Sequence, residues 1–101
     1  MTGSLQATDA AARPVQKTPN RVSLESIEEK IGWVEYIHPV AAPHMTIAVV
    51  QMKNGFIVLG KTAPADPENF DAELGRKFSR EDAIRQIWQL EGYALRERLA
   101  G

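Results

Sequence analysis

The side chains that could do chemistry in this sequence are mainly cations and aromatic rings. Arg76, Lys77 and Arg80 surround Ser79, where the residue pattern indicates the start of the longest helix. The free N–H groups and the positive dipole at a helix start bind anions, and guanidinium groups strengthen such a site. We therefore predict an anion-binding site here, with Arg85 about one turn further along. A solvated basic patch between two helices is the alternative.

A second candidate site is expected on a β-hairpin. Its aromatic residue is Phe56, and Lys53 and Gln51 are expected on the same sheet face. An aromatic ring stacks on any nucleobase, and a nearby cation can reach a phosphate. The alternative is that Phe56 packs against the short helices or against another subunit.

The hairpin itself follows from Asn54-Gly55, which separates two alternating apolar runs, 45–53 and 56–61. This dipeptide favours a two-residue type I′ turn, because both turn residues then need positive φ. The turn places Lys53 opposite Phe56, and strand alternation then defines two faces. The face expected to enter the core carries Ala48, Val50, Met52, Ile57 and Leu59. The mixed face carries Ile47, Val49, Gln51, Lys53, Phe56, Val58 and Gly60.

Catalytic and metal-binding patterns are weak. There is no cysteine, and His38 and His44 are separated by a proline-rich loop at a spacing that matches no common metal pair. The carboxylates of Glu68, Asp71 and Glu73 are equally explained as charges in the first turn of a helix. We therefore expect no enzyme activity, no metal and no cofactor.

Composition limits the class of protein. The 101 residues fit one domain, with 44% hydrophobic and 25% charged residues. A net charge of −1 gives no support to binding of duplex nucleic acid. No apolar run approaches the roughly 20 residues that span a bilayer, and the N-terminus has no signal-peptide pattern. We expect a cytoplasmic protein without a membrane segment.

The elements that must position these residues predict an α+β fold. An antiparallel hairpin or small sheet is expected to pack against a long C-terminal helix and short helices. That helix carries a wide apolar surface and the core is small, so we also expect a homo-oligomer. The predicted segments are a disordered tail (1–20) and one domain (21–101) that contains helices over 23–31, 67–74 and 80–99 and an extended segment over 33–38. Trp33, Met52 and Trp88 are expected in the core.

Several motifs taken together resemble a family of small tailed-phage proteins, most of which have no assigned role. The resemblance covers about residues 45–99, and Tyr36-x-His38 adds a weaker match. The motifs are Asn54-Gly55-Phe56, Gly60-Lys61, Asp66-Pro67-x-Asn69-Phe70-Asp71, Glu73-x-Gly75-Arg76-Lys77 and Ile87-Trp88-x-Leu90-Glu91-Gly92-Tyr93.

This family is identified as one that also contains the Thoeris anti-defence sponges. Those proteins sequester cyclic ADP-ribose-type signals, in some cases also cyclic oligonucleotides, without cleaving them. The resemblance implies a dimer or hexamer with ligand sites between subunits. The sequence departs from many relatives at Lys61-Thr-Ala-Pro-Ala, where they carry Ser or Cys. The candidate ligand-binding residues are Lys53, Phe56, Lys61, Asn69, Phe70, Arg76, Lys77, Arg80 and Arg85.

Two other functions remain open at this point. One is an inhibitor that binds a host protein through the mixed sheet face or the long helix. The other is a small structural or virion-associated phage protein.

Overall fold

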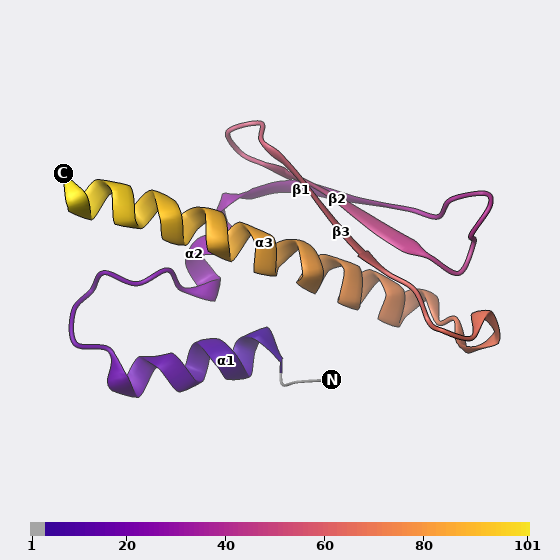
Figure 1. Cartoon of the computed structure of the whole chain (residues 1–101), viewed down its shortest axis with the longest axis horizontal. Helices are drawn as coiled ribbons and strands as arrows, with labels where there is room; N and C mark the ends of the chain where they lie inside the picture. Colours follow the sequence, from indigo (N-terminus) through magenta and orange to yellow (C-terminus); the bar gives the residue numbers. More distant parts are fainter. Residues whose placement is uncertain (1–3) are drawn as a thin grey trace.

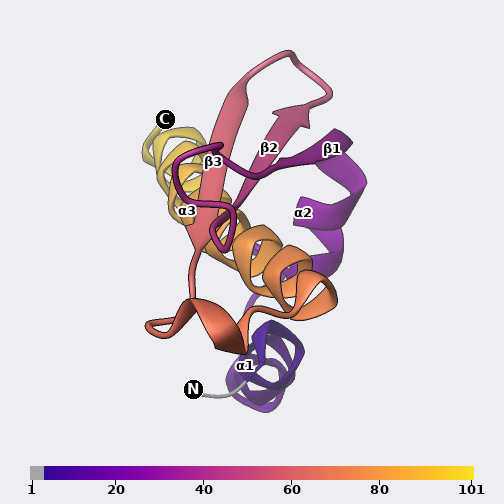
Figure 2. The same ribbon diagram turned by 90° about the vertical axis from the view of Figure 1, so that its right-hand side faces the viewer.

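A three-stranded antiparallel sheet and one long helix form the body of the molecule (Figure 1). The computed structural model describes residues 4–101. All helices lie on the same side of the sheet (Figure 2), and α3 crosses the sheet and extends beyond it toward the C-terminus (Figure 1). The predicted α+β class is confirmed. In chain order the elements are α1 (Leu5–Ala12), a 3-10 turn (Arg13–Val15), α2 (Leu24–Lys30), β1 (Ile31–Ile37), β2 (Thr46–Met52), β3 (Ile57–Thr62), a 3-10 turn (Pro67–Asn69) and α3 (Ala72–Ala100).

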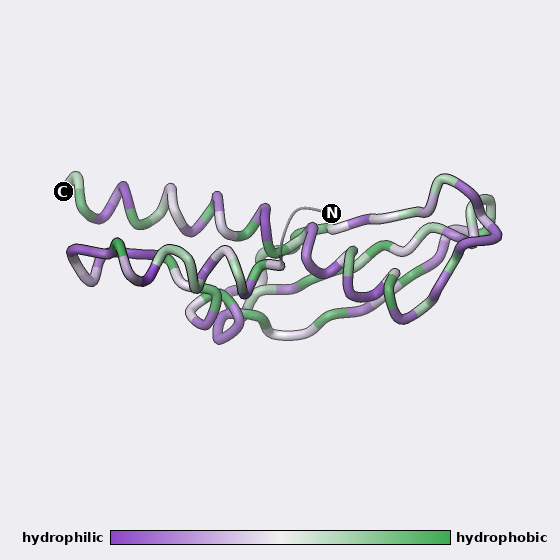
Figure 3. The backbone as a smooth tube through the Cα atoms, turned by 90° about the horizontal axis from the view of Figure 1, so that it is seen from below, coloured by the Kyte–Doolittle hydropathy of each residue, from purple (hydrophilic) through white to green (hydrophobic). Residues whose placement is uncertain are grey.

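The core lies between the sheet and the helices. Strand β2 alternates strictly, so that every second side chain is buried against α3 and the others face outward. Helix α2 closes one end of this layer, with Ile27 fully buried. Polar and apolar residues alternate along α3 as far as the C-terminus (Figure 3). The buried apolar side chains are Leu5, Leu24, Ile27, Ala48, Val50, Met52, Val58, Ala83, Ile84 and Ile87.

The hairpin turn has three residues, Lys53, Asn54 and Gly55. The Gly55 amide donates to the Met52 carbonyl at 2.8 Å, and the Met52 amide donates to the Phe56 carbonyl at 2.8 Å. Gly55 has φ +94°, and no described residue other than glycine has a positive φ. The predicted type I′ turn is therefore wrong, because that turn needs positive φ at Asn54 as well. The geometry is a type I turn followed by a glycine bulge.

The extra turn residue shifts the strand register by one. Val50 lies opposite Val58 and Gln51 opposite Ile57, in place of the predicted Val50–Leu59 pair. A shift of one residue moves every side chain of a strand to the other face. The predicted faces are correct for β2 and wrong for β3: Val58 and Gly60 face the helix, and Ile57 and Leu59 face outward.

One helix replaces the two that were predicted around Gly75. Asp71 caps α3 by accepting a 2.9 Å hydrogen bond from the Leu74 amide, and the helix then continues to Ala100. Gly75 does not end it, because its role is close approach: an added Cβ would lie 2.4 Å from Thr46 Oγ1. Ser79 is a buried position within the helix and not its cap.

The N-terminal segment differs from the predicted disordered tail, of which residues 1–3 lie outside the described part. Ser4 caps α1 by accepting a bond from the Ala7 amide at 3.0 Å. Leu5 enters the core, and the carboxylate of Asp9 accepts a 2.7 Å bond from Arg21. The tail has few large apolar residues, but buried Leu5 and the partly buried Arg21–Asp9 ion pair attach α1 to the rest of the fold.

The two tryptophans have different surroundings. Trp88 was expected in the core but is only half-buried and packs against it, and its Nε1 donates to the Val22 carbonyl at 3.1 Å. Trp33 was expected in the core but lies exposed on the outer face of β1. Within residues 4–101, no helix is both long enough and apolar enough to cross a membrane.

Candidate functional site

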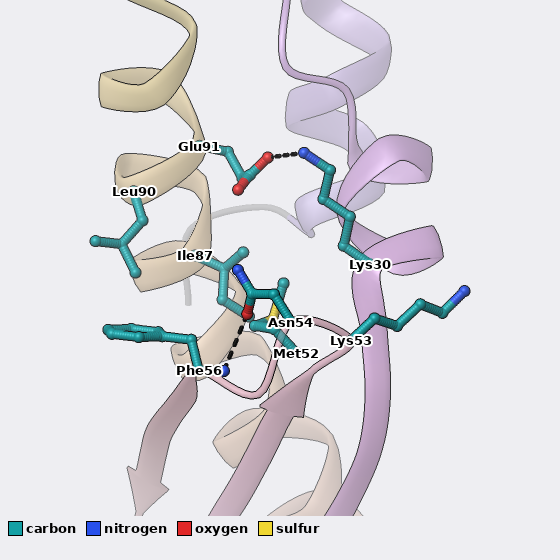
Figure 4. A pocket seen from close by; sticks show the side chains of 8 residues that line it. All are labelled: Lys30, Met52, Lys53, Asn54, Phe56, Ile87, Leu90 and Glu91. Atoms are coloured by element: carbon teal, nitrogen blue, oxygen red, sulfur yellow. Dashed lines mark hydrogen bonds and ion pairs between the residues drawn. The ribbon is translucent and has the colours of Figure 1, made fainter. Parts of the chain in front are cut away.

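A pocket opens between the hairpin tip, the end of α2 and the middle of α3 (Figure 4). Its volume is about 420 Å³. The hairpin, α2 and α3 all contribute side chains, so the site depends on the folded chain and not on one motif. Its lining consists of Lys30, Met52, Lys53, Asn54, Phe56, Ile87, Leu90 and Glu91.

Backbone hydrogen bonds fix the hairpin rim of this pocket. The Lys53 amide donates to the Lys30 carbonyl at 2.8 Å, which ties the turn to the end of α2. The Phe56 amide donates to Asn54 Oδ1 at 2.9 Å, which holds the residue that carries the aromatic ring. The rim is therefore a closed turn with its polar groups satisfied, and such a turn holds its side chains in place.

The two sides of the pocket differ in character. Phe56 is 56% exposed, and its ring lies beside Leu90 on one side (Figure 4). On the other side, the Lys30 ammonium pairs with the Glu91 carboxylate and so links α2 to α3. Buried Met52 and Ile87 form the floor.

The predicted alignment of Phe56 with Lys53 is wrong. Lys53 belongs to the turn, and its side chain extends away from Phe56 (Figure 4). Phe56 follows the turn opposite Met52, on the helix side of the sheet, because of the three-residue loop. Lys53 and Phe56 thus border the same pocket from two sides, and Phe56 does not lie on the outer face of the sheet.

This arrangement suits a ligand with a flat ring and an anionic group. The exposed aromatic ring offers a stacking surface, and the two lysines provide ammonium groups for phosphate oxygens. None of the eight lining side chains carries a hydroxyl, a thiol or an imidazole. The groups that line the pocket are therefore an aromatic ring, apolar side chains, an amide, two ammonium groups and one carboxylate.

The anion site predicted at a helix start is not formed. Because α3 begins at Ala72, Arg76 and Lys77 lie beyond its first turn, and Arg80 and Arg85 lie further along the same helix. Helical residues at this depth donate their amides within the helix, so no free N–H groups remain there. The sequence prediction placed the helix start about two turns too late.

The cations of α3 also have separate surroundings. Arg80 forms an ion pair with Glu28 of α2, and this hydrogen-bonded partner raises the pKa of the guanidinium. Lys77 Nζ lies 3.4 Å from the carboxylate of Glu81, one turn further along. Arg76 and Arg85 are exposed.

The remaining predicted residues lie elsewhere. Asn69 and Phe70 border a second cleft of about 260 Å³ beside the start of α3. His38 meets the Phe70 ring edge-on, with 5.7 Å between the ring centroids. The side chain of Lys61 lies on the outer face of the sheet, and its backbone amide donates to Asp82 at 2.9 Å. The structure therefore joins Lys53 with Phe56, and Asn69 with Phe70, but does not assemble the nine candidates into one site.

Sequence reasoning missed Lys30, Leu90 and Glu91. The signal that could have found Lys30 is the pairing of β1 with β2, where Ile31 lies opposite Met52. Had residues 31–37 been paired with the hairpin, Lys30 would have been placed beside the turn. Leu90 and Glu91 could be placed in the pocket only once the direction in which α3 crosses the sheet was known.

The comparisons with known proteins identify one family. The model for a family described as "Phage protein (N4 Gp49/phage Sf6 gene 66) family" matches residues 19–99. The match includes α2, the whole sheet and nearly all of α3, so every residue that lines the hairpin pocket lies inside it. No curated protein and no solved structure matches the chain.

Proposed function

The chain belongs to the phage protein (N4 Gp49/phage Sf6 gene 66) family, and from that premise we propose that it binds and sequesters a cyclic nucleotide immune signal. The ligand class is that of the Thoeris sponges that the sequence resembles, a cyclic ADP-ribose isomer and, secondarily, a cyclic oligonucleotide. The protein holds this signal uncleaved in the cytoplasm of the infected cell and thereby lowers its free concentration.

The observation that carries this proposal is the hairpin pocket. Its volume of about 420 Å³ falls within the range of about 300–1,000 Å³ that is usual for small-molecule sites. It combines an exposed aromatic ring, Phe56, with the ammonium group of Lys30, and Lys53 borders it from the hairpin turn. A nucleotide presents the matching groups, a flat base and a phosphate, on one small molecule.

In the proposed complex the base stacks on Phe56 and contacts Leu90. Stacking of this kind contributes about 1–3 kcal/mol per base. The phosphates approach Lys30 and Lys53, and Lys30 then shares its ammonium group between ligand and Glu91. The carboxylate of Glu91 would repel a ligand with many negative charges near that end, which favours a compact, cyclic nucleotide without a terminal phosphate.

Retention without cleavage also fits this lining. Hydrolysis of a glycosidic or phosphodiester bond needs a positioned acid or base, or a nucleophile. The only carboxylate among the lining residues is Glu91, and it is paired with Lys30. The proposal is therefore a binder that releases its ligand chemically unchanged.

Titration calorimetry of the full chain with cyclic ADP-ribose isomers and cyclic dinucleotides tests this proposal. We expect one of them to bind, Phe56→Ala to weaken binding by about fivefold or more because stacking is lost, and heating to release the ligand intact. Lys30→Gln should also weaken binding, whereas the exposed control Lys17→Gln should not. If none of these ligands binds, the proposed function is wrong.

Phe70→Ala is the matched aromatic control, because Phe70 borders the second cleft and not the hairpin pocket. Loss of binding in Phe70→Ala with normal binding in Phe56→Ala would keep the sponge function but move its site to the start of α3. Ligand recovered only as a cleaved product would replace the sponge with an enzyme.

The competing function is inhibition of a host protein by direct binding. The outward face of the sheet favours it, because several large apolar side chains are exposed there. A pull-down from host lysate separates the two functions. A stoichiometric host protein, captured while all tested nucleotides fail to bind, would favour the competing function.

A further inference from the structure

The outer face of the sheet is a regular grid of three rows and three columns. Strands β1, β2 and β3 form the columns, and Val49 occupies the centre. The rows follow from the observed pairing of the strands, with successive outward side chains two residues apart. From the hairpin end, the rows are Trp33–Gln51–Ile57, Glu35–Val49–Leu59 and Ile37–Ile47–Lys61.

This face is mostly apolar and is not covered by any described element. The helices all lie on the other side of the sheet (Figure 2). The four large apolar side chains of the outer columns are exposed by 42% at Ile37, 46% at Trp33 and Ile57, and 55% at Leu59. A contiguous apolar sheet face of this kind marks an interaction surface in a soluble protein.

The free edge of β3 is protected against the addition of another strand. The outer face of the sheet is therefore the more favourable surface for a partner than this edge. At this edge, the carbonyl of Leu59 accepts a 2.6 Å hydrogen bond from Gln86 Nε2, and the amide of Lys61 donates to Asp82. These side chains of α3 occupy backbone groups that a further strand would need, as is common at protected sheet edges.

We propose that a second copy of this chain covers the outer face, with the two sheets packed face to face about a twofold axis that runs parallel to β2 near Val49. Homodimers of this kind are isologous, so the face must be complementary to itself. The charged positions of the grid decide which twofold arrangement satisfies that condition.

Only two charged residues occur in the grid, Glu35 in the β1 column and Lys61 in the β3 column. An axis parallel to the strands exchanges the outer columns, so Lys61 of the second copy lies over β1, one row from Glu35. An axis across the strands instead superposes Glu35 on Glu35 of the second copy. Like charges opposed in an interface are unfavourable. The charges therefore select the axis parallel to β2.

The remaining grid positions agree with this axis. Val49, Ile47 and Gln51 lie on the axis column and meet their own counterparts, and the two Gln51 amides can hydrogen-bond to each other because each carries donors and acceptors. Trp33 meets Ile57 of the second copy, an aromatic–aliphatic pair. Such sheet packing, with the sheets about 10 Å apart, is typical of β-sandwich cores.

The size of the face fits a modest interface. Three strands about 4.8 Å apart, over about seven residues at about 3.3 Å each, give a face of roughly 14 by 23 Å. Such a footprint is about 320 Å², which is below the roughly 600 Å² per partner at which specific, stable interfaces begin. The dimer is therefore expected to dissociate on dilution.

Sedimentation of the full chain over a dilution series tests this inference. The wild type is expected to be dimeric at high concentration. Glu35→Lys or Lys61→Glu alone should each raise the dissociation constant by about tenfold, because symmetry places each change at two contacts. The double variant restores the opposite charges in exchanged positions and should recover dimerisation. Glu29→Lys and Lys17→Glu, exposed and off this face, are the charge controls.

Leu59→Ser should abolish the dimer, whereas Leu99→Ser on exposed α3 should not; circular dichroism of each variant checks that the fold is intact. A wild type that is monomeric at every concentration overturns the inference. So does a dimer that is lost in Leu99→Ser but kept in Leu59→Ser. Two weakened single variants without recovery in the double variant overturn the axis. Capture of a host protein by the monomer through this face would assign the face to that partner.

Discussion

Glu28 of α2 and Arg80 of α3 form a two-point ion pair, with Nη1–Oε1 at 3.1 Å and Nη2–Oε2 at 2.5 Å. The two residues are 52 positions apart in the chain, so the pair joins α2 to the long helix. The side chain that sequence reasoning assigned to a ligand is thus already engaged inside the protein. This relationship changes what a substitution of Arg80 should do.

We expect Arg80→Ala to lower the stability of the fold by about 1 kcal/mol and to leave ligand binding at the hairpin pocket unchanged. The magnitude is small because the side chains are 32% and 37% exposed, and water screens such pairs. Arg80→Lys should restore only part of the loss, since lysine lacks the planar fork. Urea unfolding of Arg80→Ala, Glu28→Gln and the double variant measures the coupling. Unchanged stability with lost ligand binding would return Arg80 to the ligand site.

Asp9 is expected to anchor α1 in a pH-dependent way. It is 3% exposed, and hydrogen bonding from Arg21 lowers the pKa of its carboxyl below the ordinary 3.8, although burial acts in the opposite direction. A lowered folded pKa means that the stabilisation is complete above the unfolded value and is lost as the pH falls through the folded value.

The Leu24 amide reports this titration, because it donates to Asp9 Oδ1 at 3.2 Å. Its NMR chemical shift should titrate with a midpoint below 3.8, and the shift should be absent in Asp9→Asn. Hydrogen exchange of residues 5–12 should rise in Asp9→Ala. A midpoint above the ordinary value would contradict the anchoring role.

Gly60 and Gly92 should respond in opposite ways to alanine. A Cβ at Gly60 would lie 1.9 Å from the Ser79 carbonyl oxygen and 2.5 Å from the Ala83 amide nitrogen, so helix and sheet would have to separate. We expect a loss of about 3 kcal/mol or more. Gly92 has open space around it, so Gly92→Ala should stabilise by up to about 1 kcal/mol. Thermal unfolding of both variants measures the contrast, and a tolerated Gly60→Ala would mean that this close contact is absent.

The hairpin register predicts a contrast between two adjacent residues. Val58 is 5% exposed and Leu59 is 55% exposed. We expect Val58→Ser to cost about 2 kcal/mol through lost burial and a buried hydroxyl, and Leu59→Ser less than about 0.5 kcal/mol. Denaturation at low protein concentration is the measurement, because dilution separates the fold from any self-association. The reverse order of costs would support the two-residue turn.

The hairpin could be predicted from the sequence, but its strand register could not. The hairpin was predictable because Asn54-Gly55 separates two apolar runs, but the same dipeptide fits a two-residue turn and a three-residue turn with a glycine bulge. Hydrophobicity does not distinguish them, because either choice buries two residues of β3. The close approach of Gly60 to α3 decides the register, and that contact involves a residue 19 positions away that no local pattern reveals.

The helices show the same limit. Asp66 and Asp71 are caps that local rules can find, but Gly75 looks like a helix end from its neighbours and is a packing position in three dimensions. For the pocket, Lys53 and Phe56 were identified from their types and spacing. Lys30 and Glu91 could not be, because their ion pair forms between α2 and α3 only after both are packed.

The central claim is that the protein holds an intact cyclic nucleotide, and native mass spectrometry of the protein recovered from infected cells tests it most directly. The account predicts a retained small molecule with the mass of a cyclic ADP-ribose isomer or a cyclic oligonucleotide, released unchanged on heating and absent from Phe56→Ala. Protein recovered without any retained nucleotide, while the infected cells contain the signal, would contradict it.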